Sequence, residues 1–298
     1  MVLVLVGTAS WTDPTLLSSG WYPAEAHDPE SRLRYYAAHF PLVEIDATYY
    51  ALPRRENARR WAERTPAGFV FDCKAFRLFT QHPTSAAALP PDLRPQAVQK
   101  SQEKIYYRDL SEEARRELWK RFRDGLSPLK ESGKLGVVLF QFPPWFSYGT
   151  ENIDHLRHCA GMLEGYRIAV EFRNRSWFSG RRSEETLRWE SEHRLIPVIV
   201  DEPQGTSASV PTIWAIPSSE VAVVRLHGRN RETWMARNLR SAADRFRYLY
   251  DDAELRDLAA GVRSLRASRV HVLFNNCYRD YGVRNAARFQ EIVAAMGS

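Results

Sequence analysis

The sequence lacks the short motifs that identify several common classes of enzyme. No G-x-G-x-x-G, P-loop, H-E-x-x-H or G-x-S-x-G string occurs, so dinucleotide-binding, P-loop NTPase, zincin and α/β-hydrolase functions have no motif to support them. Cysteine is also scarce. Cys73, Cys159 and Cys277 are widely spaced, which favours neither a disulfide framework nor a C-x-x-C metal site. This cysteine usage fits a reducing, cytoplasmic location best.

Long hydrophobic runs are missing as well. The apolar run from Val2 to Val6 is too short for a signal peptide, and no later stretch approaches the ~20 apolar residues that a bilayer-spanning helix needs. We therefore expect a soluble protein with no membrane association. The 298 residues carry 42 Lys and Arg against 36 Asp and Glu, a balance that favours anionic partners without requiring them.

The sequence alternates short β-branched runs with longer segments in which apolar residues recur every three or four positions. This alternation is typical of parallel strands joined by crossover helices. We expect strands at Leu3 to Gly7, Val43 to Thr48, Phe69 to Lys74, Gly136 to Phe142, Arg167 to Phe172, Ile196 to Asp201, Val221 to His227 and Val270 to Asn275. Eight such strands in about 300 residues predict an α/β fold of the (β/α)8 TIM-barrel type, formed by residues 1–298 as a single domain. An open doubly wound sheet is the alternative.

The expected helices occupy most of the segments between these strands. They are Ser31 to Phe40, Asn57 to Arg64, Ser111 to Ser132, Asn152 to Leu163, Ser183 to Arg194, Ala236 to Ala260 and Arg284 to Met296. Ser111, Asn152 and Ser183 are the expected N-caps of three of them, because each precedes acidic residues that suit the positive end of a helix.

Two segments break this regular alternation. The connection 202–220 contains Pro203, Gly205, Pro211 and Pro217, which predicts that one outer helix is short or missing. The segment 76–110, after the third strand, is long and rich in proline. Long loops in compact domains are usually lids, binding loops or disordered segments, so we interpret this insertion as a cover over the site.

Polar residues recur at the downstream ends of the expected strands. Burying an unpaired ion costs several kcal/mol, so repeated charges at one end of a sheet indicate a shared polar site. The active sites of parallel barrels are built at this end, and alternate residues of a strand point inward. An interior ion-pair network that only holds the barrel together is the alternative interpretation. The set includes Glu44, Asp46, Thr48, Asp72, Lys74, Gln141, Glu171, Arg173, Asp201, Arg225, His227, Asn275 and Asn276.

Chemical roles within this set follow from residue type. We take His227, Glu171, Glu44 and Asp46 as the catalytic candidates, with His227 favoured for proton transfer because its ordinary pKa lies near neutrality. A structural histidine bonded to a carboxylate is equally consistent with the sequence.

Binding candidates are the cations, the amides and the aromatic residues. Arg173 and Arg225 suit phosphate or carboxylate because a guanidinium donates two parallel hydrogen bonds, and Lys74 suits an anion clamp. The amides Gln141, Asn275 and Asn276 join them. The aromatic candidates Tyr49, Trp11, Trp177 and Trp234 follow strands, as does Trp145, where they could stack a base or a sugar or pack loops onto the barrel.

Metal binding is a further possibility, although we commit to no cofactor. Only His227 among the eight histidines ends a strand, which argues against a multi-histidine zinc site. Asp46, Glu44, Glu171 and Asp201 could together hold one Mg²⁺ or Mn²⁺ through oxygen ligands.

Many ordered motifs resemble those of the DUF72, or YecE-like, family. The resemblance extends over essentially the whole chain and implies a TIM barrel, but it implies little about the reaction. Asp46 stands where the family usually has asparagine. The motifs are 7–11 (GTASW), 21–23 (WYP), 36–37 (YA), 43–50 (VEIDATYY), Trp61, 65–66 (TP), 69–74 (FVFDCK), 141–144 (QFPP), 170–173 (VEFR), 176–177 (SW), 225–228 (RLHG) and 274–276 (FNN).

Three functions remain open from the sequence. The first is hydrolysis of a phosphate-bearing substrate, such as a phosphodiester or a nucleic acid, with Arg173, Arg225 and Lys74 binding the anion. The second is a sugar isomerase, epimerase or lyase that uses a carboxylate base, with Glu44 and Glu171 as the obvious pair. The third is a non-catalytic nucleic-acid-binding or scaffolding protein. The sequence favours no particular oligomeric state.

Overall fold

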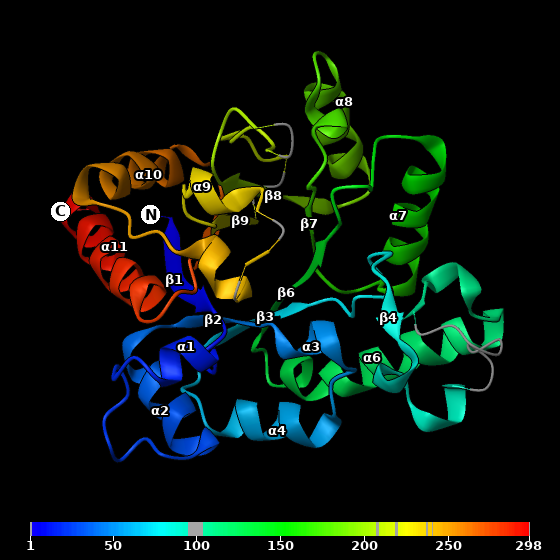
Figure 1. The fold of residues 1–298 in the computed structure, drawn as a ribbon, viewed down its shortest axis with the longest axis horizontal. Coiled ribbons are helices and arrows are strands. Elements are labelled where there is room, and N and C mark those ends of the chain that lie inside the picture. The colour runs from blue at the N-terminus through cyan, green and yellow to red at the C-terminus, as the bar shows by residue number, and fades with distance from the viewer. Residues whose placement is uncertain are drawn as a thin grey trace.

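The centre of the computed structural model is a closed barrel of eight parallel strands (Figure 1). Residues 2–94, 104–206, 209–217, 220–236, 238–239 and 241–297 are described. Around the barrel the strand order is β1-β10-β9-β8-β7-β6-β3-β2, so the first strand of the chain pairs with the last. The predicted α/β barrel is thus confirmed. Its strands are β1 (Leu3–Ala9), β2 (Leu42–Ile45), β3 (Val70–Lys74), β6 (Leu135–Gln141), β7 (Ile168–Glu171), β8 (Leu195–Asp201), β9 (Val221–Leu226) and β10 (Arg269–Phe274).

Helices surround the barrel, and the described residues of the β8–β9 crossover form none, which confirms the prediction of a missing outer helix. No helix in the described part of the chain is long and apolar enough to span a membrane. The α-helices are α1 (Pro14–Leu17), α2 (Pro29–His39), α3 (Ala47–Tyr50), α4 (Arg55–Glu63), α6 (Glu112–Glu131), α7 (Thr150–Met162), α8 (Arg182–Glu192), α9 (Arg231–Trp234), α10 (Asp252–Ser264) and α11 (Tyr281–Gly297).

Two of the three predicted N-caps and one predicted helix differ from the structure. Ser111 does cap α6, by accepting a hydrogen bond from the backbone N–H of Ala114. Asn152 and Ser183 instead lie inside α7 and α8, whose N-caps are Gly149 and Arg181. The single helix expected over 236–260 is wrong: the described residues there form a short 3-10 turn, 242–246, and the first turns of α10.

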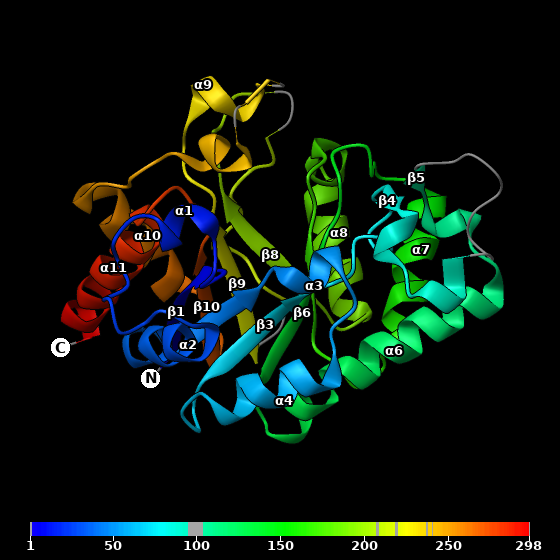
Figure 2. The same cartoon turned by 60° about the horizontal axis from the view of Figure 1, so that its bottom comes forward.

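The insertion after β3 packs beside the barrel (Figure 2). Its short strands β4 (Thr84–Ser85) and β5 (Lys104–Ile105) pair with each other near α6 and α7. Phe79 stacks on Trp119 of α6 with ring centroids 3.6 Å apart, and Tyr107 shares a 2.7 Å hydrogen bond with His158 of α7. The described part of the insertion is therefore fixed to the outer helices. Residues 95–103 lie outside the described part of the chain, and a covering role stays a prediction.

Strand residues alternate between the helix layer and the barrel interior, as predicted. On β9, Val224 and Leu226 join the large core between barrel and helices, whereas Val221 and Val223 belong to an apolar cluster inside the barrel. Arg225 continues this inward row. The interior below is consequently apolar apart from the buried pair of Asp72 and His271, and the upper end of the barrel is polar.

Candidate functional site

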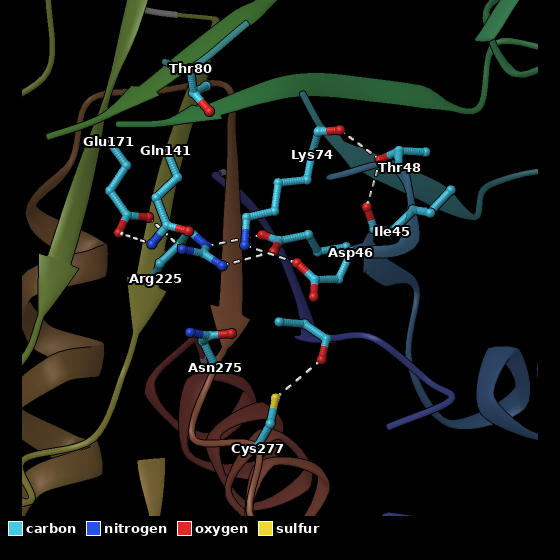
Figure 3. A network of polar contacts seen from close by, with 12 residues as sticks. Ile45, Asp46, Thr48, Lys74, Thr80, Gln141, Glu171, Arg225, Asn275 and Cys277 are labelled. Atoms are coloured by element: carbon cyan, nitrogen blue, oxygen red, sulfur yellow. Dashed lines mark hydrogen bonds and ion pairs between the residues drawn. The ribbon is translucent and has the colours of Figure 1, made fainter. Parts of the chain in front are cut away.

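A buried arginine forms the base of the polar end of the barrel. The guanidinium of Arg225 is fully buried and donates two parallel hydrogen bonds to Glu44, from Nε at 2.9 Å and from Nη2 at 2.7 Å. Its Nη1 donates a short hydrogen bond to Glu171. Such a bidentate, charge-assisted arrangement satisfies most donors of the guanidinium in an environment without water. Figure 3 shows this network with side chains from β2, β3, β6, β7 and β9.

A second arginine continues the network toward the mouth. Arg173, two residues beyond Glu171, forms ion pairs with Glu171 and with Glu202 at 2.9 Å. The two arginines together hold the pKa of Glu171 well below its ordinary value, although burial acts in the opposite direction. Burial raises the pKa of Glu202 to about 7, against the lowering influence of Arg173. One carboxyl of the network is thus poised to exchange a proton near neutral pH.

His227 lies between these groups and is almost completely buried. Its Nε2 is 3.1 Å from Glu171 Oε1, and its Nδ1 is 2.8 Å from Asn275 Nδ2. Burial, followed by the charge of Arg173, lowers the pKa of His227 to about 3. A neutral ring accepts from Asn275 at Nδ1 and donates from Nε2 to Glu171. Arg173 Nη2 also lies 3.0 Å from Nε2, but a guanidinium only donates, so this tautomer does not make a hydrogen bond with it. This state suits the positioning of Glu171 better than proton transfer at neutral pH.

Lys74 and Asp46 form the part of the network that reaches solvent. Lys74 Nζ donates a 2.8 Å hydrogen bond to Asp46 Oδ1, and the two side chains are 12% and 33% exposed. Burial lowers the pKa of Lys74, but Asp46 and Glu44 outweigh it, so the pKa is raised and the amine stays charged. Lys74 in turn lowers the pKa of Asp46 despite its burial. Among the described residues, Asp46 Oδ2 has no hydrogen-bond partner, so this oxygen can contact a substrate.

A cavity of about 530 Å³ opens at the mouth next to this network. Arg173 and Gln141 contribute to its lining, and Gln141 also donates a 2.9 Å hydrogen bond to Glu171. The volume is within the range of small-molecule sites. Residues from the loops after β3, β6 and β9 complete the lining: His82, Phe142, Pro143, Pro144, Trp234, Met235, Ala236, Arg245 and Phe246.

Two of the aromatic candidates lie at this mouth. The guanidinium carbon of Arg173 is 5.5 Å from the Trp234 ring, and Lys74 Nζ is 4.8 Å from the Tyr49 ring. Both aromatic rings therefore lie next to the polar network.

Four predicted site residues lie elsewhere. Trp177 is buried and stacks on Phe172, and Trp11 packs against Trp61 and Phe71 in the layer between barrel and helices. These two indoles hold loops onto the barrel. The strand pattern did not show this, because residues that follow a strand by a few positions can turn outward as readily as inward. The remaining two are Asn276, which bonds Tyr248 and Asn285, and Asp201, which bonds Arg229 and Tyr250.

The four carboxylates considered for a metal do not gather around a common point. Asp201 is held by Arg229 and Tyr250, whereas Glu44 and Glu171 bind Arg225. Across the described ranges, no group of three or more His, Cys, Asp or Glu residues could hold a metal ion. Every one of these carboxylates already has a cationic partner.

Glu202 is a site residue that the strand pattern did not identify. The pattern ends β8 at Asp201 and assigns the next residue to the irregular connection. Alternation carries the signal, however: Asp201 points outward to Tyr250, so Glu202 must point inward, where it meets Arg173. Its other oxygen accepts a 2.8 Å hydrogen bond from the Val210 N–H, which ties the β8–β9 crossover to the site.

Comparisons with known proteins agree with this architecture. The family model described as "Protein of unknown function DUF72" matches residues 5–297. The chain is 34% identical over 280 residues to UPF0759 protein YunF of Bacillus subtilis, covering 92% of this chain and 89% of the relative. It is 26% identical over 219 residues to UPF0759 protein YecE of Escherichia coli K12, covering 73% of this chain and 66% of the relative.

Solved structures of similar chains have the same fold. A DUF72 family protein from Enterococcus faecalis V583 superposes with a TM-score of 0.76 at 28% identity, covering 99% of this chain and 98% of the other. A DUF72 family protein from Thermotoga maritima MSB8 also gives 0.76, at 27% identity and with 98% and 99% covered. Neither description names an activity.

Proposed function

This chain belongs to the DUF72 family, whose function is unknown, and from its own site we propose an enzyme that moves a proton on a small, sugar-like carbonyl substrate. The observation that carries the proposal is the pair of Asp46 and Lys74 at the barrel mouth, with one free carboxylate oxygen beside an ammonium group. A base next to a cation is the arrangement that proton abstraction beside a carbonyl requires. Isomerases, epimerases and some lyases share this step.

In the proposed reaction, Asp46 Oδ2 accepts the proton of the C–H bond next to the substrate carbonyl. The electron pair of that bond moves onto the carbonyl oxygen, where the Lys74 ammonium stabilises the negative charge. As Lys74 turns toward the substrate oxygen, its hold on Asp46 weakens, which raises the pKa of that carboxyl and makes it a stronger base. Asp46 then returns the proton to the former carbonyl carbon, and the proton of the neighbouring hydroxyl passes to the former carbonyl oxygen, which leaves the new carbonyl at the neighbouring carbon and completes an isomerisation.

The near balance of acidic and basic groups in the site favours a substrate that carries little net charge. Asp46, Glu44, Glu171 and Glu202 oppose the permanent cations Lys74, Arg173 and Arg225, and His227 is neutral. Because burial raises the pKa of Glu202 to about 7, this carboxyl does not add a full negative charge near neutral pH, and the network is close to balanced. It therefore offers hydrogen bonds of both kinds to hydroxyl and carbonyl groups, without a spare cation at its base.

Solvent hydrogen exchange tests this proposal directly. A panel of aldoses, ketoses and uronic acids is incubated with the protein in D₂O, and loss of C–H signals is followed by proton NMR. We expect exchange in at least one sugar, lowered at least about 100-fold in Asp46→Asn. This variant keeps an acceptor for Lys74 and removes the base. Asp154→Asn, at an exposed ion pair on α7, is the matched control and should exchange at the wild-type rate. No exchange anywhere in the panel by folded protein would overturn the proposal.

Hydrolysis of a phosphate ester is a second candidate, and one observation favours it. Arg173 and Arg245 both line the mouth cavity, and Arg245 has no carboxylate partner among the described residues. Its guanidinium donates to the carbonyls of Trp234 and Ala236, which fixes it at the rim. Bis(p-nitrophenyl) phosphate and p-nitrophenyl phosphate, assayed with and without Mg²⁺ or Mn²⁺, test this candidate. Hydrolysis that Arg245→Gln weakens would support it, and no hydrolysis under any condition would reject it.

A further inference from the structure

A row of aromatic rings leads from the barrel mouth to a second cavity. Tyr50 contacts Tyr49 with ring centroids 5.0 Å apart, Tyr49 contacts His82 at 5.3 Å, and His82 contacts Trp145 at 5.7 Å. The row passes beside Lys74, whose Nζ is 4.8 Å from the Tyr49 ring. At its ends Tyr50 and Trp145 are 56% and 59% exposed, unusually high for such large rings. Successive rings meet edge to face, so it is the two exposed end rings that offer surfaces on which a flat group can stack.

The second cavity lies between the insertion and α7 and has a volume of about 610 Å³. Trp145 forms the wall on the side of the row, and Tyr106 contributes another aromatic face. The size is suitable for a ligand larger than one sugar ring. The rest of the lining is Gln81, Pro83, Tyr107, Arg108, Arg115, Glu151, His155 and His158.

Two arginines along this path lack the carboxylate partners that the arginines of the barrel network have. Arg77 is 5.2 Å from the Tyr49 ring, and in the part of the chain that the structure describes it forms no ion pair. Arg115, which also has none there, donates from Nε and Nη2 to the carbonyls of Tyr107 and Arg108. These bonds hold its guanidinium in place without neutralising it. Glu151 also lines the cavity, and Arg77 and Arg115 together outweigh its single negative charge, so the path carries net positive charge.

We propose that the aromatic row and the second cavity bind a nucleotide unit, with the base stacked on Trp145 and the phosphate next to Arg115. Stacking faces beside fixed, unneutralised guanidinium groups recognise a flat ring that carries a phosphate. A neutral oligosaccharide would use the aromatic faces but would leave Arg77 and Arg115 without an anion. The neighbouring His155 does not add to the charge, because burial lowers its pKa to about 4. Glu151 can accept a hydrogen bond from a ribose hydroxyl.

The ligand can be a free nucleotide or one nucleotide of a single strand, since both present the same base and phosphate. Binding is measured by titrating the full chain with AMP, with a short single-stranded DNA of mixed sequence, and with maltohexaose, at about 50 and 200 mM salt. The readouts are Trp fluorescence and calorimetry. Affinity for the DNA alone assigns the site to single strands, and affinity for AMP as well assigns it to nucleotides in general. In either case the higher salt weakens binding. No binding of AMP or DNA, or tighter binding of maltohexaose, overturns the proposal.

Matched variants locate the site. Trp145→Ala removes an exposed ring that is not needed for the core, and should weaken binding at least about tenfold. Arg115→Gln should weaken it too, whereas its neighbour Arg116→Gln, on an exposed ion pair with Glu112, should not. Equal affinities for the wild type and Trp145→Ala would overturn the assignment. The two proposals are tested separately, because Asp46→Asn should remove exchange into sugars and should leave nucleotide binding at the second cavity unchanged.

Discussion

At the scale of single residues, Arg225 holds the buried part of the polar network together. Its guanidinium is fully buried and binds Glu44 and Glu171, which are fully buried as well. Removing one partner of such a set leaves uncompensated charge in an environment without water. Breaking a buried pair in this way costs about 3–5 kcal/mol, far more than loss of an exposed pair.

We therefore expect Arg225→Met to lower the free energy of unfolding by about 3–5 kcal/mol, measured by urea denaturation at neutral pH. The control is Arg157→Met, which removes an exposed ion pair with Asp154 and should cost less than about 1 kcal/mol. Glu44→Gln provides the same comparison with a smaller change if Arg225→Met does not fold. Equal effects of the buried and exposed substitutions would show that the network is not the desolvated set described above.

Glu202 gives the site a specific pH dependence. Because burial raises its pKa in the folded protein to about 7, the folded state retains a proton that the unfolded chain loses at its lower ordinary pKa. The stabilising contribution of the protonated carboxyl is complete below the unfolded pKa and is lost as the pH rises through about 7.

Comparison with Glu202→Gln isolates this contribution from other titrating groups. Between about pH 4.5 and 7, the stability of the wild type relative to Glu202→Gln should fall by about 3 kcal/mol, since each unit of pKa shift corresponds to about 1.4 kcal/mol. The measurement is urea unfolding of both proteins at a series of pH values. A difference that stays constant, or that rises with pH, would contradict the assignment of a raised pKa.

Much of the network could be predicted at this scale, because side-chain alternation in a strand is a local property. Alternation alone places Glu44, Lys74, Glu171, Arg173 and Arg225 on the inward face, where they are found. Local sequence does not determine which way a side chain points once a strand has ended. The sequence therefore predicts Trp177 and Trp11 at the mouth, whereas the structure places both in the packing outside the barrel.

At the scale of elements, the packing of β6 against the barrel interior depends on one glycine. A Cβ atom at Gly136 would lie 2.2 Å from Asp72 Oδ1 and 2.9 Å from His271 Cε1. Asp72 and His271 form a buried pair at 2.9 Å below the polar network, and Asp72 also accepts from the Val137 N–H at 2.9 Å. Glycine at this position makes room for the aspartate between two strands.

Gly136→Ala should consequently push Asp72 away from His271 and lower the free energy of unfolding by about 1–3 kcal/mol, the usual cost of overpacking a core. Gly68→Ala is the control, because nothing lies within 4 Å of the added methyl group and the position shows no left-handed backbone. Chemical denaturation of both variants supplies the measurement. If Gly136→Ala leaves the free energy of unfolding unchanged, β3 and β6 can move apart at this point without loss of stability.

The strands of the barrel were predictable, whereas part of the helical layer was not. Parallel strands buried on both faces appear as continuous apolar runs, and these runs are distinct from any surface helix. The segment 236–260 has helical periodicity and many arginines, but Asn230 and Arg245 fold it back on itself through hydrogen bonds to Arg247, Trp234 and Ala236. Such long-range bonds override local propensity.

At the scale of the whole molecule, the barrel closes through the two ends of the chain. Leu3 to Thr8 of β1 pair with Arg269 to Phe274 of β10, and β1 also pairs with β2. Helix α11 covers this junction: Phe289 is fully buried and lies 5.6 Å from Phe274, measured between ring centroids. The first and the last elements of the chain therefore stabilise each other, so loss of this contact should affect the entire barrel.

Phe289→Ala tests whether the molecule unfolds as one unit. Replacing a buried phenylalanine by alanine costs about 3–5 kcal/mol, and in a closed barrel that loss should lower the stability of every strand. Tryptophan residues occur in both halves of the chain, from Trp11 to Trp234, so fluorescence and far-UV circular dichroism report on the whole barrel. We expect both signals of Phe289→Ala to shift to the same lower urea concentration, and Met296→Ala, at an exposed position of the same helix, to leave them unchanged. Two separate transitions would show instead that the N-terminal half keeps its structure without closure, because independent units unfold at different denaturant concentrations.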